Sequence, residues 1–328
     1  ALPAQSTARR EISALRTPTP IRLDGILDEE VWTRATAATG FVQSEPREGE
    51  PSTERTEVWV AFDAENLYIA AFMHDAAAAR AIVNDIRKDF REDDQDDFEV
   101  ILDTFRDRRN GYVFITNPAG GRVDRQISNE GREINSSWDA IWDVRTARRD
   151  DGWTAEMVIP FRTLRFEPGA DQRWGINFAR RIRHKNEITF WSPVPRAFNL
   201  MRLSLAGDVV GLEMPSAGRD LRVKPYLLAN TVRDVGVRAY DQTFDAGLDL
   251  KFAVTRGLTL DATVRPDFAQ VEADEQQVNL TQFAQFFPEK REAFLENSGI
   301  FYVGDAARNN RVFVPATPDD DNLLFFSR

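Results

Sequence analysis

The stretch Gln95-Asp96-Asp97-Phe98-Glu99-Val100-Ile101-Leu102-Asp103 joins an acidic loop to an alternating segment. From Phe98 onward every second side chain is apolar, and side chains two residues apart on a strand lie on the same face of a sheet. We therefore predict a strand over residues 98–103 that turns one face toward a core. The acidic loop places several carboxylates at the start of this strand.

Segments of the same kind flank this stretch on both sides. Residues 56–62 alternate and residues 67–73 are almost continuously apolar, and the turn-forming run Asp63-Ala64-Glu65-Asn66 separates them. Further strand candidates are residues 112–117, 122–128, 142–146, 153–159, 174–181 and 187–191. Residues 76–90 are predicted as one helix. Short strands at this spacing predict an all-β fold, an antiparallel β-sandwich.

A change of composition at Pro215-Ser216-Ala217-Gly218-Arg219-Asp220 marks a domain boundary. We divide the chain into an extended N-terminal segment (1–20), a sandwich domain (21–215) and a hairpin-rich extension (216–328). In the extension, residues 221–231, 245–255 and 258–265 alternate over long runs, and Arg256-Gly257 makes a hairpin. Strands that cross an outer membrane need about 9–11 residues, and a closed barrel needs at least about eight of them. The extension therefore resembles the first strands of such a barrel and does not close one alone.

Bulk composition excludes several classes of function. The net charge of −11 disfavours nucleic acid as a partner, and the absence of cysteine excludes disulfides, thiolate metal sites and cysteine nucleophiles. No apolar run of about 18 residues predicts a transmembrane helix. The opening residues Ala1-Leu2-Pro3-Ala4-Gln5-Ser6 are typical of the end left by a cleaved export signal. We expect an exported protein, periplasmic or associated with the outer membrane.

Five stretches in order resemble the carbohydrate-binding modules of family 9. They are Ile21-Arg22-Leu23-Asp24-Gly25, Leu27-Asp28-Glu29 with Trp32, residues 58–62 leading into 67–69, residues 95–103 and residues 152–160. Residues 266–274, 279–281 and 286–291 are similar to bacterial outer-membrane proteins that carry this module in front of a large barrel of unclear function. In such relatives many strands continue beyond the position of Arg328. We therefore expect a natural truncation, a processing product or the ordered part of something longer.

The resemblance also implies a sugar site. In sugar-binding members two tryptophans clamp a sugar ring while polar side chains take its hydroxyls. One clamp position aligns with Asp93 and an arginine position with Ile115, so both are changed here. Glu99 matches the acidic partner, and Trp191 is a candidate for the second aromatic. Trp138 and Trp142 share a face at this spacing and form either an aromatic platform for glycan or part of the sandwich core.

Metal-ligating residue types occur in two places. Asp93, Asp94, Asp96 and Asp97 offer hard oxygen ligands in one loop, and the resemblance implies structural calcium; the alternative is a solvated loop. The histidines, His74 and His184, are far apart in sequence and make a poor zinc site, although His74 with Asp75 would contribute to one. The basic stretch of residues 180–185 pairs either with an acidic partner or with acids of its own domain.

No catalytic motif is present. The sequence lacks a Gly-x-Ser-x-Gly elbow, a phosphate-binding loop and a dinucleotide fingerprint, and its many carboxylates do not by themselves make a glycosidase. We predict a non-enzymatic, exported binding or docking module, an accessory subunit on the extracytoplasmic face of a membrane complex or a partner of another envelope protein. The aromatic-rich residues 283–326 are expected to be buried in that assembly. The alternative is a carbohydrate-binding protein of the cell envelope that recognises glycan through exposed tryptophans and carboxylates.

Overall fold

The computed structural model describes residues 9–136, 138–167, 169, 171–213, 221–233, 240–255 and 258–264. The predictions for the boundary run at 215–220, the turn at 256–257 and the aromatic-rich segment 283–326 therefore lie outside the described residues. The chain divides into two compact units, one built from residues up to 216 and one that begins at 217. Each unit is described by itself.

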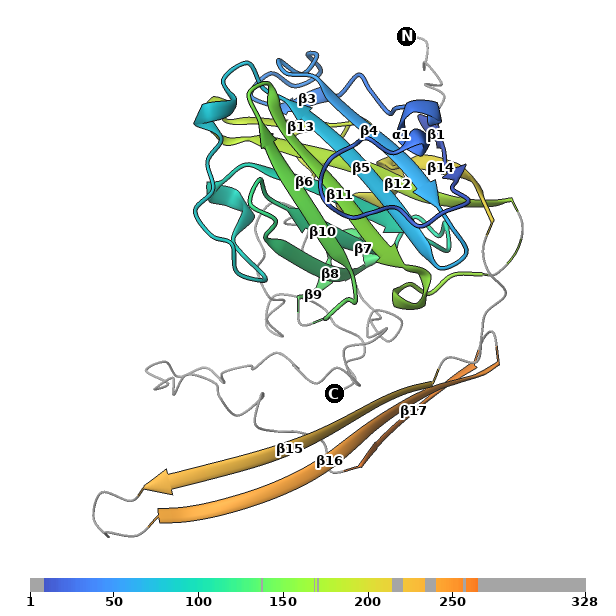
Figure 1. The fold of residues 1–328 in the computed structure, drawn as a ribbon, viewed down its shortest axis with the longest axis vertical. Coiled ribbons are helices and arrows are strands. Elements are labelled where there is room, and N and C mark those ends of the chain that lie inside the picture. The colour runs from blue at the N-terminus through green and yellow to red at the C-terminus, as the bar shows by residue number, and fades with distance from the viewer. Residues whose placement is uncertain are drawn as a thin grey trace. The chain divides into compact units, whose positions relative to one another are not determined.

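Two stacked sheets make up the first unit (Figure 1). The large sheet has nine strands in the order β1-β14-β12-β6-β7-β8-β9, with β13 paired to β12 and to β3. Its strands are β1 (Glu11–Ser13), β3 (Val42–Glu45), β6 (Asp97–Asp103), β7 (Gly111–Thr116), β8 (Arg122–Ser128), β9 (Glu133–Asn135), β12 (Gln172–Ile182), β13 (Glu187–Phe190) and β14 (Gly207–Leu212). The small sheet has the order β10-β11-β5-β4-β2, with β2 (Leu15–Arg16), β4 (Thr56–Phe62), β5 (Asn66–His74), β10 (Asp143–Arg149) and β11 (Gly152–Pro160).

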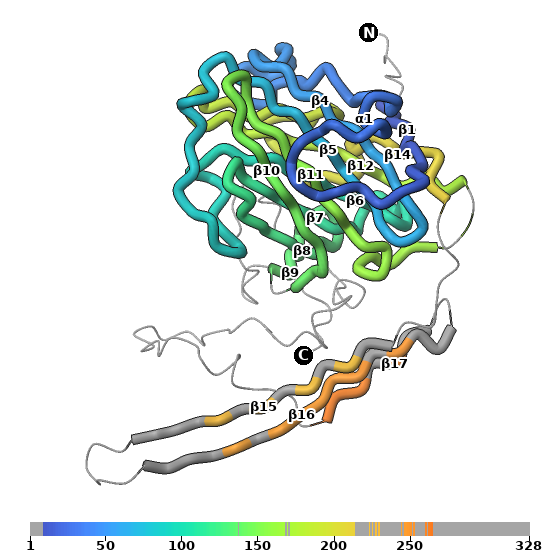
Figure 2. Tube along the Cα trace, in the orientation of Figure 1, coloured from blue at the N-terminus to red at the C-terminus, as the bar shows by residue number. Residues whose placement is uncertain are grey.

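The N-terminal strands belong to both sheets. β1 pairs in parallel with β14, and β2 pairs in parallel with β4. Figure 2 shows the start of the described chain, in blue, beside the yellow strand β14. Almost all other pairs of the sandwich are antiparallel, as the short strands and polar turns predict.

The main core lies between the sheets. Alternate side chains of β4 and β5 meet those of β6 and β12, among them Val60, Ile69, Phe98, Trp174 and Phe178, all fully buried. A fully buried side chain of this size contributes about 1.5–3 kcal/mol to folding. The alternation of apolar residues in the sequence therefore marks the side chains that enter the core, and the all-β sandwich prediction is confirmed.

Each sheet also buries its outer face. On the large sheet, Ile101, Ile115 and Phe190 are covered by residues 194–206. On the small sheet, Ala70 is covered by the helix α1 (Glu30–Arg34) and the segment before it, with Trp32 facing inward as predicted. Part of the outer face of the large sheet is therefore apolar, and charged side chains of β6 and β12 lie on another part of the same face.

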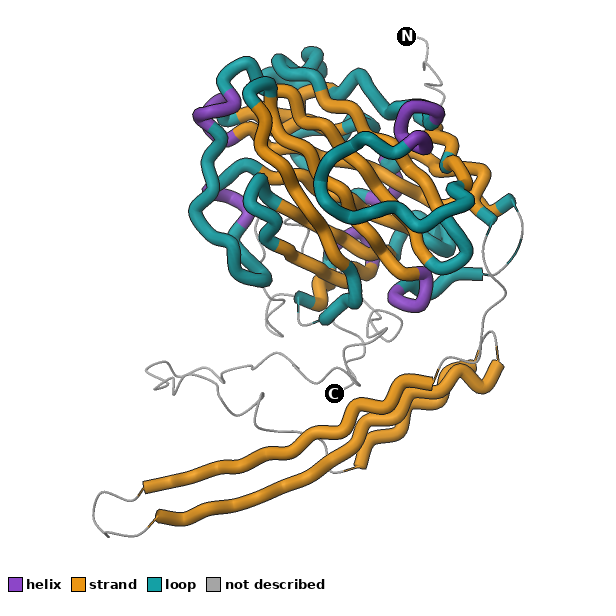
Figure 3. Tube along the Cα trace, in the orientation of Figure 1, coloured by secondary structure: helices purple, strands orange, loops and turns teal. Residues whose placement is uncertain are grey.

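Helix is scarce in the described chain (Figure 3). Besides α1 there are only 3₁₀ turns, namely η1 (Ala78–Arg80), η2 (Glu92–Asp94), η3 (Asn129–Gly131), η4 (Phe161–Thr163), η5 (Arg183–Lys185) and η6 (Leu203–Leu205). The predicted helix over residues 76–90 is wrong. Side-chain oxygens of the following loop take its amides instead, since Gln95 accepts from Asn84 and Asp85, and Asp96 accepts from Ile82. Within the described ranges, no helix is long and apolar enough to cross a bilayer.

The second unit contains a three-stranded antiparallel sheet. Its strands are β15 (Leu221–Arg233), β16 (Tyr240–Thr255) and β17 (Leu258–Val264), in that order. The register places apolar residues opposite one another, for example Leu227 against Ala246 and Phe252 against Leu260. The resemblance of this extension to barrel strands stays a prediction.

Candidate functional site

A cluster of charged side chains lies on the outer face of the large sheet. On β6, Phe98 and Val100 enter the main core, so Asp97 and Glu99 project to the opposite face. The register sets Asp97 directly beside Arg181 of β12. We call this group the ion-pair cluster; its members are Glu92, Asp93, Asp97, Glu99, Arg125 and Arg181.

Arg181 is the centre of the cluster. Its Nε donates to Asp97 Oδ2 at 3.1 Å and its Nη1 to Asp93 Oδ1 at 3.2 Å. Its Nη2 lies 3.8 Å from Glu99 Oε1. Only 17% of the Arg181 side chain is exposed, so one guanidinium faces three carboxylates in a setting that excludes most water.

Arg125 makes a second, separate pair. Its two terminal nitrogens donate to the two carboxylate oxygens of Glu92 at 2.6 and 3.0 Å. This bidentate geometry is the strongest arrangement of an arginine and a carboxylate. Burial acts to raise the pKa of Glu92, but the hydrogen bonds and charge of Arg125 outweigh it and hold that pKa below its usual value.

Asp97 and Glu99 behave in the opposite way. Burial raises the pKa of Asp97 well above its usual value against the attraction of Arg181, and the charges of Glu99 and Glu92 raise it further. Burial also raises the pKa of Glu99, again opposed by Arg181. Arg125 and Arg181 hydrogen-bond to Glu92, Asp93 and Asp97, and a ligand hydroxyl reaches these three carboxylates only by competing with those pairs.

The four predicted calcium ligands do not share one position. Asp93 and Asp97 both bind Arg181, and Asp94 is exposed. Asp96 is buried and accepts a hydrogen bond from the amide of Ile82 at 2.6 Å. A guanidinium therefore occupies the place between Asp93 and Asp97 that calcium would need. Calcium binding by these aspartates stays a prediction.

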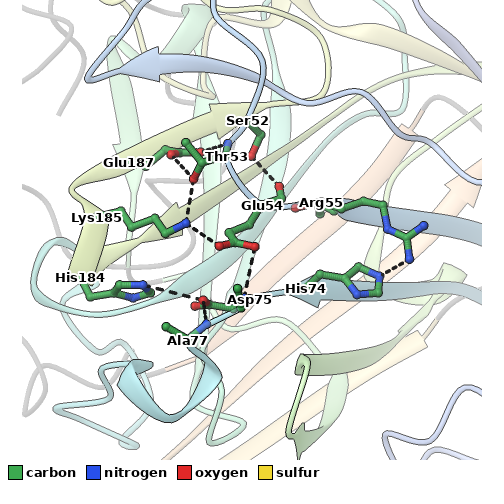
Figure 4. A network of polar contacts seen from close by, with 12 residues as sticks. Ser52, Thr53, Glu54, Arg55, His74, Asp75, Ala77, His184, Lys185 and Glu187 are labelled. Carbon is green, nitrogen blue, oxygen red and sulfur yellow. Dashed lines mark hydrogen bonds and ion pairs between the residues drawn. The ribbon is translucent and has the colours of Figure 1, made fainter.

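A second polar network joins the ends of several strands (Figure 4). Glu187 accepts hydrogen bonds from Ser52 and Thr53, and Lys185 pairs with Glu54. Close to this network lies a group formed by Asp75, Asp96 and His184. In the described part of the chain it is the one group of at least three histidine and carboxylate side chains whose ligand atoms lie close enough to share an ion.

Sequence reasoning did not find this group. The sequence suggested His74 with Asp75 as contributors to a zinc site. In the structure His74 bonds to Glu57 and Arg55, and the histidine that approaches Asp75 is His184. His184 lies in the basic stretch of residues 180–185, which the sequence did single out. The hydrogen bond of Arg181 to Asp97 confirms that this stretch pairs with an acid of its own domain. No spacing rule links His184 to Asp75, because the sheet topology alone brings them together.

Comparison with known protein families assigns the sandwich. A family model described as "Carbohydrate family 9 binding domain-like" matches residues 23–188. The chain belongs to this family. A second model, described as a domain of unknown function (DUF5916), matches residues 219–313. No curated protein matches the chain.

One solved structure supports the fold of the family 9-like domain. A putative carbohydrate-binding protein from Bacteroides uniformis has a TM-score of 0.51 at 12% identity, with 62% of this chain and 99% of that one covered. A family 9 carbohydrate-binding module from Caldicellulosiruptor kristjanssonii in complex with cellotriose has a TM-score of 0.42 at 17% identity, with 63% and 95% covered. At these identities the likeness concerns the fold alone.

The predicted sugar contacts of this family 9-like domain do not lie together: one is on the charged outer face and three are in or against the core. Of Glu99, Trp138, Trp142 and Trp191, only Glu99 lies in the ion-pair cluster. Trp142 and Trp191 are 5% and 3% exposed in the main core, and Trp138 packs against that core. Trp142 also donates its indole N–H to the buried Asp124. These rings offer little free face for a sugar to stack on, and their role as ligand contacts stays a prediction that their burial does not favour.

Proposed function

We propose that this chain is a non-catalytic docking module, an accessory subunit that attaches to a membrane complex on its extracytoplasmic face. The observation that carries the proposal is one face of the three-stranded sheet. Its described side chains are all apolar: Val223, Pro225, Leu227, Ala229, Phe244, Ala246, Leu248, Leu250, Phe252, Leu260, Ala262 and Val264. We call it the apolar face.

The opposite face of the same strands is mostly polar. Among the described side chains there, Asp249 pairs with Thr263 of the neighbouring strand. On the apolar face, Leu227 is 88% and Phe244 77% exposed. A contiguous apolar surface of this kind marks a site for a partner or a lipid environment, because leaving it in water is unfavourable. This supports docking at a membrane, with the family 9-like domain carried along as a scaffold.

The ion-pair cluster supports the same proposal from the other unit. Arg125 and Arg181 hold Glu92, Asp93 and Asp97 on the charged face, and Asp93 is the position at which the family resemblance implies a clamp aromatic. The sandwich thus keeps the family fold, while the predicted contacts Trp138, Trp142 and Trp191 lie in or against its core.

Flotation with membranes tests the proposal. The purified chain is mixed with native membranes stripped of peripheral proteins and floated through a density gradient. We expect the wild type to float, and the double variant L227S/F244S to stay at the bottom. D249S, on the opposite face, is the matched control and should float like the wild type. If the wild type does not float, or if the double variant floats equally, docking through the apolar face is wrong.

Glycan binding is the second candidate. It is favoured by membership of the family and by Glu99, whose side chain lies on the charged face and is 14% exposed. Calorimetry with a panel of oligosaccharides tests it, with E99Q as the variant. The docking proposal predicts no saturable heat of binding for any oligosaccharide. Saturable binding by the wild type that E99Q abolishes would favour glycan binding as the function instead.

A further inference from the structure

Three side chains converge where the two sheets of the sandwich meet at one end. Asp75 directly follows β5 of the small sheet, while Asp96 directly precedes β6 and His184 lies in η5 after β12, both in the large sheet. One ligand atom of each lies within 4.8 Å of the other two. These distances fit side chains arranged around a common centre rather than bonded directly to one another.

The histidine has no other visible role. Its side chain is only 4% exposed, and neither ring nitrogen has a hydrogen-bond partner among the described residues. Its Nε2 lies 3.8 Å from Asp75 Oδ1, which is too long for a hydrogen bond. Leaving a buried polar group without a hydrogen-bond partner is unfavourable. Such a nitrogen, aimed at two buried carboxylates, points to a missing positive partner.

The charges around the centre lead to the same conclusion. The carboxylates of Glu54, Asp75, Asp96 and Glu187 act on the buried guanidinium of Arg180, and Lys185 pairs with Glu54. In these contacts carboxylates outnumber cations, so the centre suits a positively charged ligand.

We propose that Asp75, Asp96 and His184 bind one divalent metal ion, with zinc as the best match. Two carboxylate oxygens and one imidazole nitrogen suit zinc, whereas calcium requires six to eight oxygens. The carboxylates are also oriented: Asp75 Oδ1 accepts the amide of Ala77 at 2.8 Å, and Asp96 Oδ2 accepts that of Ile82. Such outer hydrogen bonds hold metal ligands in place.

The role of the ion is structural. It joins the end of β5 in the small sheet to the ends of β6 and β12 in the large sheet (Figure 4 shows Asp75 and His184). Because the chain has no cysteine, a disulfide cannot make this link. The metal site is independent of the docking function and goes beyond it.

Zinc titration of chelator-treated protein tests the proposal. We expect calorimetry to give one zinc ion per chain, a melting temperature that rises by several degrees with zinc, and no displacement by excess calcium. H184Q and D96N should each weaken zinc binding by at least about tenfold. H74Q removes the other histidine and is the matched control, which should bind as the wild type does.

The wild type alone supplies a readout that does not depend on the folding of variants. X-ray absorption at the zinc edge should show one imidazole nitrogen and oxygen ligands. Absence of zinc uptake by the wild type would overturn the proposal. Equal loss of binding in H74Q, or zinc binding by H184Q at wild-type strength, would overturn it as well.

Discussion

Glu156 shows how one residue ties the segment of residues 24–32 to the small sheet. It is 1% exposed on β11, and its carboxylate accepts hydrogen bonds from the amides of Asp24 and Gly25 and from the indole N–H of Trp32. Burial raises the pKa of Glu156 to about 7, and the charge of Glu29 adds to the rise. The carboxyl group is therefore a proton-binding site of the folded state.

This raised pKa predicts a pH dependence of stability. The ordinary pKa is 4.5 and the folded-state pKa about 7, so between these values the folded chain holds a proton that the unfolded chain has lost. The contribution of Glu156 to stability thus falls as the pH rises through this window, by roughly 3 kcal/mol. Urea unfolding at pH 5, 6 and 8 should show this fall in the wild type relative to E156Q. E30Q, at an exposed site, should follow the wild type; parallel curves for wild type and E156Q would contradict the assignment.

Arg181 gives a second prediction at this scale. R181Q leaves Asp97 and Glu99 without their cation and should lower the free energy of unfolding at pH 7 by ~2–4 kcal/mol. Since both carboxyl groups have raised pKa values, their protonation should reduce this loss as the pH falls. D93N, whose side chain is 73% exposed, should cost less than ~0.5 kcal/mol. Chemical denaturation measures all three proteins, and equal losses in R181Q and D93N would disprove the central role of Arg181.

At the scale of elements, the sequence predicted what local patterns decide. Alternation located β4 and β6 because one face of each enters the main core. It failed at residues 76–90, where the side chains of Gln95 and Asp96 in the following loop accept hydrogen bonds from the backbone amides. Glu99 was identified from the family pattern, whereas the approach of His184 to Asp75 depends on which strands are neighbours, which no local pattern encodes.

The hairpin of β10 and β11 depends on Gly152. This residue has φ +145°, and a Cβ there would meet the carbonyl oxygen of Met73 on the paired strand β5. G152A should therefore cost ~2–4 kcal/mol, because it adds a backbone clash to conformational strain. G49A is the matched control, with φ +86° but no atom within 4 Å of the added Cβ, and should cost ~1 kcal/mol from strain alone. Thermal unfolding compares them, and similar losses would show that the close approach of β5 is unimportant.

At the scale of the whole molecule, two kinds of surface distinguish the two units. The sandwich keeps the family 9 fold, with arginines holding the carboxylates of its charged face and its tryptophans largely in the core. The second unit presents the apolar face. Composition excluded disulfides and disfavoured nucleic acid as a partner, but only the register of β15, β16 and β17 shows that the described apolar residues form one continuous face. Together these surfaces favour a partner bound through apolar contact over a glycan bound by aromatic stacking.

The most direct test of docking is affinity capture of the chain from gently solubilised native membranes, with mass identification and quantification of what is retained. The account predicts a membrane protein complex at constant stoichiometry with the wild type, and its loss with L227S/F244S but not with D249S. Recovery of the wild-type chain alone would contradict docking as the function of this protein.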